Sequence, residues 1–483
     1  MDNKNTTSLV TKIDTTNVKT TLEQISIPLT EYVQYNSLPI NNVLATNEEK
    51  SKLFMNFSSA IDALPIEKRE KSEYLTKFVI ACAVGLFDGA LNYLWDEIIK
   101  SLREKIVNYD LMYFYSVAEQ TNKNYKNLKT QEDLQFISDH DFLDIIRRIG
   151  LIDDIAYHSL DKINYLRNNA SATHPNINEL TGIKLSSLLE DGIKYAILSQ
   201  PNPSMITIKT LFNNILKTQI PFDDFDVISE ELIKLNEESL NDFAISIFGL
   251  YCDPKTEEFV LTNIIEISKR IWKSLTETTR YSIGSKFGVY RANGDAIRKD
   301  RVNNYLETVE GLNYKDNESI ISELNDLLNQ LRSVHFSFDN FYNEYIYARD
   351  IEKIIPKTGV PSSVKKLLVK VICLCYAGNG NGYFEGVDVN AVKIYEKFIE
   401  KFGNEEIKHL ITLFSDSEFT VEFYKTKPNR RIKELCQKLL TKTNNEDLKT
   451  GLQLIIKHPD HSLSKLYLTS DYKKLISKIN DNK

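Results

Sequence analysis

Apolar and polar residues alternate along most of the chain with the period of an α-helix. Between positions 91 and 106 the apolar residues recur every three or four positions, with charged residues between them, which is the pattern of an amphipathic helix. The same period predicts further helices at 142–149, 153–168, 178–198, 232–250 and 259–275. The period-two alternation that is typical of a strand is sparse. The pattern therefore predicts an all-α protein.

Two stretches interrupt the helical pattern. Residues 200–204 contain two prolines, which block a helix on both sides, and residues 357–363 combine glycine, proline and serine. These breaks suggest a division of the chain into four parts. We expect a polar N-terminal arm at 1–50, a helical bundle at 51–199, a middle helical domain at 205–356 and a C-terminal helical domain at 362–483. The arm is expected to be weakly structured or draped over the first domain.

The composition favours long helices and excludes one class of nucleic-acid binding. The 483 residues include 17 glycines and 12 prolines, well below the usual share of about 12% for the two together. Apolar residues make up 42% of the chain and charged residues 26%, so the chain can bury hydrophobic cores. The net charge of −7 argues against binding long duplexes by charge alone. Any contact with nucleic acid is therefore expected to be local.

The cysteines and the apolar stretches predict a soluble, cytoplasmic protein. Five cysteines are scattered through apolar runs, which suits reduced thiols better than a disulfide framework. The longest apolar stretch, residues 78–87, has about half the length of a membrane span. The first residues are polar and lack the apolar core of a signal peptide. We expect no contact with a membrane.

One polar segment between two predicted helices carries the candidate chemistry. It begins with Arg167 and Asn168 at the end of a helix, and six residues separate Arg167 from His174. The proline after the histidine disfavours the α region for His174, so we expect this histidine in a turn at a helix boundary. Asn176 or Asn178 is then expected to cap the next helix.

This combination of side chains suits the cleavage of an RNA phosphodiester. An arginine fork binds phosphate, and an imidazole that titrates near neutral pH can accept or deliver a proton. A second interpretation involves no chemistry, because a polar connector between two helices uses similar residues as caps.

The segment resembles the Arg-x4–6-His motif of the HEPN superfamily (higher eukaryotes and prokaryotes nucleotide-binding), which is usually written Arg-Asn-x-x-x-x-His with one residue more or less. Here Arg167-Asn168 is followed by His174. The order of elements is also similar, with long helices, the motif at a helix end and then a closing helix. The resemblance covers about residues 51–198.

The resemblance implies a metal-independent ribonuclease of the toxin or phage-defence type. It assigns phosphate binding and charge stabilisation to Arg167, and general acid–base catalysis to His174. Asn168 would orient the histidine or donate a hydrogen bond to the phosphate. Members of the family often add an acidic residue from an earlier helix, which Asp96 or Glu97 would supply here.

The resemblance also implies the partners. These are RNA as substrate, a second copy of the chain in a homodimer, and an antitoxin or a phage component as trigger. We expect no cofactor and no metal, because the motif domain shows no grouped cysteine or histidine ligands. Other members of the superfamily are non-catalytic, so the alternative function is a helical interaction or nucleotide-binding scaffold.

A basic run near the C-terminus is the second candidate for contact with RNA. It consists of Lys425, Lys427, Arg430, Arg431 and Lys433. A solvated helix face and a surface that binds RNA phosphates both fit this run.

Two further groups are interpreted as structural. The glycine-rich residues 378–382 lack the lysine and serine or threonine of a phosphate-binding loop, so we expect a turn. Cys373 and Cys375 lie in an apolar run without a second cysteine or histidine pair nearby, and we expect them in the core.

Overall fold

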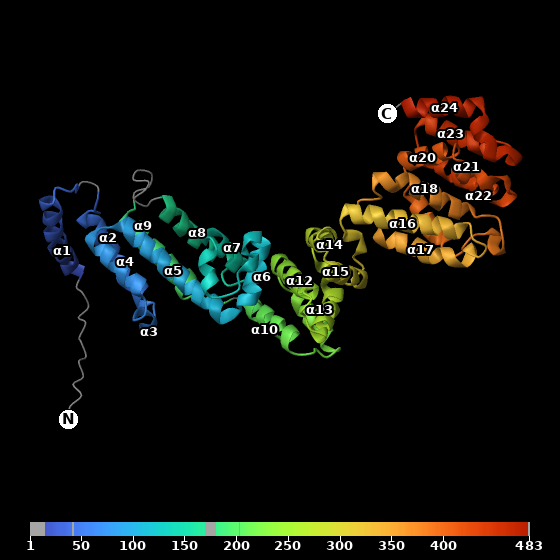
Figure 1. Ribbon diagram of the computed structural model, residues 1–483. Helices are drawn as coiled ribbons and strands as arrows, with labels where there is room; N and C mark the ends of the chain where they lie inside the picture. The colour runs from blue at the N-terminus through green and yellow to red at the C-terminus, as the bar shows by residue number, and fades with distance from the viewer. Residues whose placement is uncertain (1–14, 41–42, 170–179, 202, 482–483) are drawn as a thin grey trace. The chain divides into compact units, whose positions relative to one another are not determined.

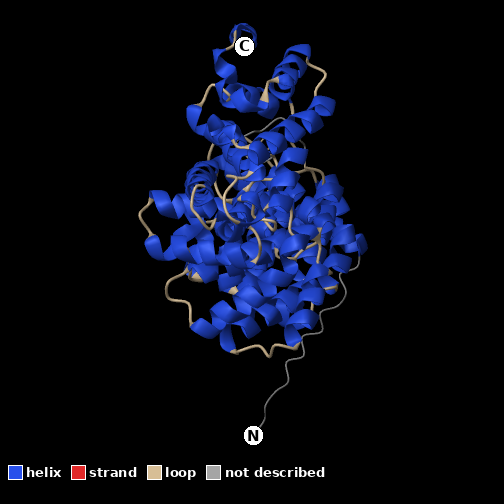
Figure 2. Ribbon diagram, turned by 90° about the vertical axis from the view of Figure 1, so that its right-hand side faces the viewer, coloured by secondary structure: helices blue, strands red, loops and turns tan. Residues whose placement is uncertain are grey.

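The computed structural model describes residues 15–40, 43–169, 180–201 and 203–481. Every regular element within these residues is a helix, as Figure 2 shows, and no strand occurs among them. The predicted all-α class is therefore confirmed. No helix in this part of the chain combines the length and the apolar character needed to cross a membrane.

The chain divides into two compact units. Unit 1 comprises residues 1–250 and 257–274, and unit 2 comprises residues 251–256 and 275–483. Figure 1 labels the helices in chain order. The described helices assigned to unit 1 are α1 (Thr15–Tyr35), α2 (Asn47–Asp62), α3 (Ile66–Arg69), α4 (Glu73–Val84), α5 (Phe87–Tyr109), α6 (Leu111–Thr121), α7 (Asp139–Arg148), α8 (Asp154–Asn169), α9 (Gly182–Gly192), α10 (Pro203–Lys217), α11 (Asp224–Ile233), α12 (Glu237–Cys252, whose last two residues belong to unit 2) and α13 (Glu258–Ile271).

Unit 2 contains the helices from α14 onward. The described ones are α14 (Glu277–Ala292), α15 (Ala296–Thr308), α16 (Asn317–His335), α17 (Asn340–Ile354), α18 (Ser362–Ala377), α19 (Val392–Glu400), α20 (Asn404–Leu413), α21 (Ser417–Thr420), α22 (Thr426–Leu439), α23 (Glu446–Lys457) and α24 (Ser470–Asp481).

The start of the chain is more ordered than the sequence pattern predicts. Residues 15–35 form α1, and α2 begins at Asn47, so the expectation of a weakly structured arm up to residue 50 is wrong for these residues. The alternative of a draped arm fits better, because α1 packs against α2 and α4. The buried Lys50 amine of α2 donates to Ser26 Oγ of α1 at 2.5 Å, and Leu22 of α1 is buried.

The helix after the candidate motif begins later than predicted. Its cap is Thr181, whose Oγ1 accepts a hydrogen bond from the backbone N–H of Lys184 at 3.3 Å. The predicted caps Asn176 and Asn178 lie outside the described residues. After Gly192, the helix continues as a single π-helical turn, which spans Ile193–Ile197.

Helix α5 forms the centre of unit 1. Its apolar residues recur every three or four positions and are buried, so that one face of the helix lies in the core. Helices α4, α8 and α9 pack against it. The turn from α4 into α5 uses Gly85 with φ at +91°, a conformation that a residue with a Cβ rarely adopts. Because α5 and α8 pack together, residues of both helices contribute to one polar surface at the end of α8.

Helix α18 has the corresponding place in unit 2. Every residue from Leu368 to Ala377 is buried, and a helix that is covered on all sides belongs in the middle of a domain. Helices α16, α19, α20 and α22 pack around it. The prediction that Cys373 and Cys375 lie in the core is confirmed, since both are fully buried. All five cysteines fall within the described residues, and each is buried and free of a disulfide.

Candidate functional site

Arg167 lies in the last turn of α8, where an aspartate of α7 holds it. Its Nη1 donates to Asp139 Oδ2 at 2.7 Å, and the same oxygen accepts a hydrogen bond from the indole Nε1 of Trp95 at 2.8 Å. The side chains of Arg167 and Asp139 are each 29% exposed, so the pair is half-buried at the surface of unit 1. Helices α5, α7 and α8 thus each contribute one side chain to this arrangement.

The start of α7 explains the position of Asp139. Ser138 caps the helix by accepting a hydrogen bond from the backbone N–H of Asp141 at 3.1 Å. Asp139 is the first helical residue, where the helix dipole favours a negative charge. Arg147 and Arg148 lie in the last turn, where the dipole favours positive charge. The N-terminal end of α7, which carries Asp139, is the end that contacts Arg167.

The polar side chains described around Arg167 engage only part of its guanidinium group. Nη1 also lies 3.4 Å from Asn164 Oδ1, and the same amide oxygen accepts a hydrogen bond from Asn168 Nδ2 at 3.2 Å. The guanidinium carbon lies 5.9 Å from the centre of the Trp95 ring. The Nη2 and Nε atoms of Arg167 have no hydrogen-bond partner among the described residues. These donors are available to an oxygen ligand such as a phosphate.

The acidic partner of Arg167 is a residue that the sequence did not single out. Asp96 and Glu97 were the expected candidates, but the ion pair is made by Asp139. Asp96 still lies within the electrostatic field of the pair. Partial loss of hydration raises the pKa of Asp96; Arg167 opposes this rise and Asp139 adds to it. Glu97 is a buried residue of α5.

His174 lies outside the described residues, so the structure does not place it beside Arg167. The described chain ends at Asn169 in α8 and resumes at residue 180. The chain imposes an upper limit, because seven residue steps of about 3.5 Å keep the two Cα atoms within about 25 Å. Of the site residues predicted in this motif, the structure places Arg167 and Asn168 together, with Asn164 between their side chains.

The basic run lies at the start of α22 and in the residue before it, and its charges are engaged within the chain. Its partners are Glu422 for Lys425, Glu385 for Lys427 and Arg430, the Tyr376 carbonyl for Arg431, and Asp460 for Lys433. Some of these cations remain accessible, and the side chain of Arg430 is 62% exposed. Contact between this run and RNA stays a prediction, and RNA would have to compete with these partners.

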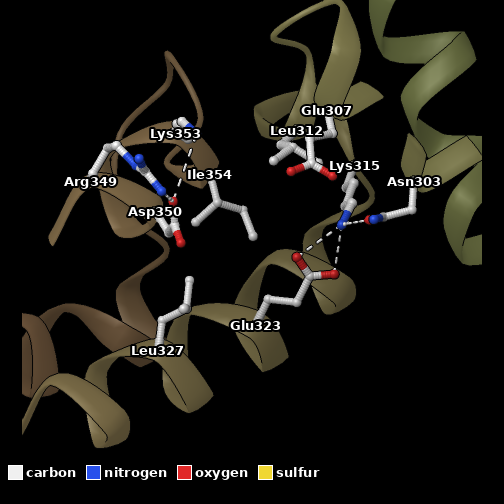
Figure 3. A pocket seen from close by; sticks show the side chains of 10 residues that line it. All are labelled: Asn303, Glu307, Leu312, Lys315, Glu323, Leu327, Arg349, Asp350, Lys353 and Ile354. Carbon is white, nitrogen blue, oxygen red and sulfur yellow. Dashed lines mark hydrogen bonds and ion pairs between the residues drawn. The ribbon is translucent and has the colours of Figure 1, made fainter. Parts of the chain in front are cut away.

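Unit 2 contains a polar cavity of about 240 Å³, which Figure 3 shows. The amine of the buried Lys315 donates to both carboxylate oxygens of Glu323 at 2.8 and 2.9 Å, and to Asn303 Oδ1 at 2.7 Å. Across the cavity, Asp350 pairs with Arg349 and Lys353. Most of the charged groups in the cavity pair with one another, and we assign no catalytic role to the cavity.

The geometry at the end of α8 is therefore that of a half-buried arginine with spare donors, positioned by Asp139 and Trp95 and accompanied by two asparagines. It is suited to hold an anionic oxygen ligand. Comparison with known proteins adds no relative to this picture, since no family model, no curated protein and no solved structure matches the chain.

Proposed function

We propose that the chain is a metal-independent endoribonuclease of the HEPN type that acts as a toxin or as an antiviral defence effector. The observation that carries the proposal is the state of Arg167. Asp139 occupies one terminal nitrogen of its guanidinium group, and Nε and the second terminal nitrogen have no partner among the described residues. This arginine directly precedes the segment that contains His174.

In the proposed reaction, Arg167 binds the scissile phosphate and stabilises the negative charge that develops on its oxygens. Asp139 is a positioning residue that holds the guanidinium group through Nη1. Asn168 donates a hydrogen bond to Asn164 Oδ1, the oxygen that Arg167 also contacts. In the proposed reaction, Asn168 donates a hydrogen bond to the phosphate or orients His174.

His174 supplies the proton transfers. As a base, the imidazole removes the proton of the ribose 2′-hydroxyl, and the 2′-oxygen forms a bond to phosphorus while the bond to the 5′-oxygen breaks. An acid delivers a proton to that leaving oxygen. The products are a 2′,3′-cyclic phosphate and a 5′-hydroxyl. In a dimer, His174 of the partner subunit would serve as the acid.

Two exposed apolar side chains beside the motif support the proposed homodimer. Tyr165 of α8 is 60% exposed and Ile183 of α9 is 59% exposed. Helices α8 and α9 pack against each other, and the undescribed segment with His174 connects them. A two-fold axis near this end of the helices would bury both side chains and bring two motifs together. Light scattering is expected to give about twice the chain mass of 55.7 kDa, and Tyr165→Glu is expected to reduce it.

The test of the proposed chemistry uses an RNA oligonucleotide in excess EDTA. We expect the wild-type chain to cut it, and we expect no cut where the mapped position carries a 2′-deoxy sugar. Arg167→Ala and His174→Ala should lose cleavage. Cleavage that stops in EDTA, or that persists at the deoxy position, would contradict the proposed reaction.

The chain offers a matched control for each of these variants. Arg147 is a half-buried arginine that pairs with Asp144 and Glu238, and His140 is an exposed histidine near Asp161. Neither is assigned a role in the reaction, so Arg147→Ala and His140→Ala should both retain cleavage. Equal losses in the controls would mean that the assay measures general damage to the fold.

The second candidate function is a non-catalytic interaction scaffold. The ion pair between Arg167 and Asp139 favours it, because a carboxylate already neutralises part of the arginine's charge. The two functions differ in cells. Expression with and without phage infection should cause RNA breakdown and toxicity for the wild-type chain only, if the ribonuclease proposal is right. Equal harmlessness of wild type, Arg167→Ala and His174→Ala would favour the scaffold.

A further inference from the structure

Three side chains that are common metal ligands meet in the core of unit 2. They are His335 at the end of α16, Glu344 in α17 and Cys375 in α18, and all three are fully buried. An imidazole nitrogen, a carboxylate oxygen and the thiol sulfur lie within 4.8 Å of one another. Helix α16 packs against both α17 and α18.

Hydrogen bonds hold the carboxylate of Glu344 in place. Its Oε1 lies 2.8 Å from His335 Nδ1 and accepts a hydrogen bond from Asn340 Nδ2 at 2.9 Å. Its Oε2 accepts a hydrogen bond from the hydroxyl of Tyr395 in α19 at 2.8 Å. This arrangement resembles the outer hydrogen bonds that orient ligands in metal sites.

Two polar features of the cluster lack a counterpart within the described part of the chain. The buried imidazole Nε2 of His335 has no hydrogen-bond partner there, and among the described residues no lysine or arginine pairs with the buried carboxyl group of Glu344. Both an isolated buried charge and an unpaired buried donor are costly.

A divalent cation matches the charge of these three side chains in their metal-binding forms. One carboxylate and one thiolate carry a total charge of −2, which a divalent ion neutralises, and the imidazole contributes as a neutral ligand. Sulfur, nitrogen and oxygen ligands together suit zinc better than calcium or magnesium, which prefer oxygen alone.

We propose that His335, Glu344 and Cys375 bind one divalent transition-metal ion, with zinc as the best match, and that the ion joins α16, α17 and α18. The role is structural, because the three ligands are fully buried and RNA has no access to them. The proposal is independent of the ribonuclease chemistry, because Arg167 and His174, the residues assigned to that chemistry, belong to unit 1.

A glycine-rich loop covers this part of the core and is tied to the same residues. The side chain of Asn379 donates to the backbone carbonyl of His335 at 2.7 Å, and Asn340 donates to the carbonyl of Gly386 at 2.6 Å. Gly378 and Gly386 both have positive φ, which lets the loop turn back over the cluster. The residues first interpreted as a simple turn thus connect directly to the proposed ligands.

The test is the metal content of the full chain. The protein is produced in medium with added zinc, passed over a column with a weak chelator, and analysed by mass spectrometry for metals. We expect about one zinc ion per chain in the wild type. Cys375→Ser and Glu344→Gln should lower the metal content by about tenfold or more. Arg167→Ala should leave it unchanged.

Cys373→Ser is the matched control. Cys373 is equally buried and lies two residues away in the same helix, but it is not part of the cluster. This variant should keep its metal. If Cys375→Ser retains as much zinc as Cys373→Ser, the assigned ligands are wrong.

A second measurement uses the wild-type chain, so its result does not depend on whether a variant folds. Cobalt added to metal-free wild type should give the near-ultraviolet absorption of a thiolate bound to cobalt, and zinc should displace it. A folded wild-type chain, judged by its helical circular dichroism, that retains no zinc and shows no such absorption with cobalt would overturn the proposal.

Discussion

Arg148 and Arg167 each lie in the last turn of a helix in unit 1 and each pairs with an aspartate, but the two guanidinium groups are occupied to different extents. Arg148 donates from Nε and Nη2 to the two carboxylate oxygens of Asp242, at 3.0 and 2.5 Å, and from Nη1 to Thr121 Oγ1 at 2.7 Å. Arg167 uses only Nη1 for its contacts with described residues.

The side chains of the Arg148–Asp242 pair are also more deeply buried than those of the Arg167–Asp139 pair. The side chains of Arg148 and Asp242 are 15% and 5% exposed, whereas those of Arg167 and Asp139 are both 29% exposed. The bidentate, buried pair joins α7 to α12, and all three nitrogens of Arg148 take part in hydrogen bonds within the chain. A single contact at the surface fixes an arginine and keeps its other donors available. The comparison indicates that Arg148 serves the fold and that Arg167 is available for function.

The largest effect is expected for Arg148→Ala. The change leaves the buried carboxylate of Asp242 without its cation, and we expect the free energy of unfolding to fall by about 3–5 kcal/mol. Urea unfolding measures it. Arg147→Ala is the control, since that arginine pairs with more exposed carboxylates, and it should cost about 1 kcal/mol or less. Equal losses in the two variants would remove the distinction between buried and exposed pairs.

Arg167→Ala is expected to have the opposite profile. Cleavage should fall by about 10²–10³-fold, as for the loss of one group that stabilises transition-state charge. The free energy of unfolding should change by about 1 kcal/mol or less, because Asp139 is accessible to water and keeps the hydrogen bond from Trp95. Urea unfolding and the oligonucleotide assay measure the two quantities. A loss of stability as large as that of Arg148→Ala would make Arg167 structural.

Lys105 tests the cost of a cation that pairs with no carboxylate among the described residues. Its amine donates to the carbonyl of Ala196, and to the carbonyl and hydroxyl of Ser199 at 2.7 Å each. Burial lowers its pKa to about 8. Between pH 8 and its ordinary value near 10.5 the unfolded chain therefore binds more protons than the folded chain, so stability rises with pH in this window.

Lys105→Met should remove this pH dependence. We expect the wild type to gain, relative to the variant, up to about 2 kcal/mol between pH 8 and 10.5 after allowance for solvent screening. Thermal unfolding of both proteins across this range measures the difference. If the difference in stability between the two proteins stays constant with pH, the pKa of Lys105 is not lowered in the folded chain.

The smallest effect is expected for Trp95→Phe. The ring remains, but Asp139 loses one of the two donors to its Oδ2 atom. We expect a loss of about 1 kcal/mol in stability and a decrease in cleavage of about tenfold or less. The oligonucleotide assay and urea unfolding measure both. A decrease as large as that of Arg167→Ala would mean that the indole contacts the substrate itself.

Local patterns in the sequence predict the helices well, because each depends on neighbours within a few positions. The apolar period of α5 is an example, and the apolar run of residues 371–377 fits a helix end that is buried on all sides. The start of α9 was misjudged because several polar residues are plausible caps, and only the structure shows that Thr181 makes the bond.

The partners of the functional side chains are not local, and the sequence does not reveal them. Asp139 precedes Arg167 by 28 positions and belongs to another helix. Its only signal is an acidic residue in the first turn of a capped helix, which many helices have. The cluster in unit 2 is harder still, since His335, Glu344 and Cys375 come from three helices with no spacing that matches a known metal motif.

The close approach of α2 and α9 has an evolutionary consequence. A Cβ at Gly182 would lie 2.0 Å from the carbonyl oxygen of Glu49, and the Gly182 N–H donates to Glu49 Oε2 at 2.7 Å. Helix α9 is thus anchored at its first residue, as Asp139 anchors Arg167 near the end of α8. A larger residue at position 182 would have to push α9 away from α2, so we expect this position to remain glycine while exposed positions of both helices vary.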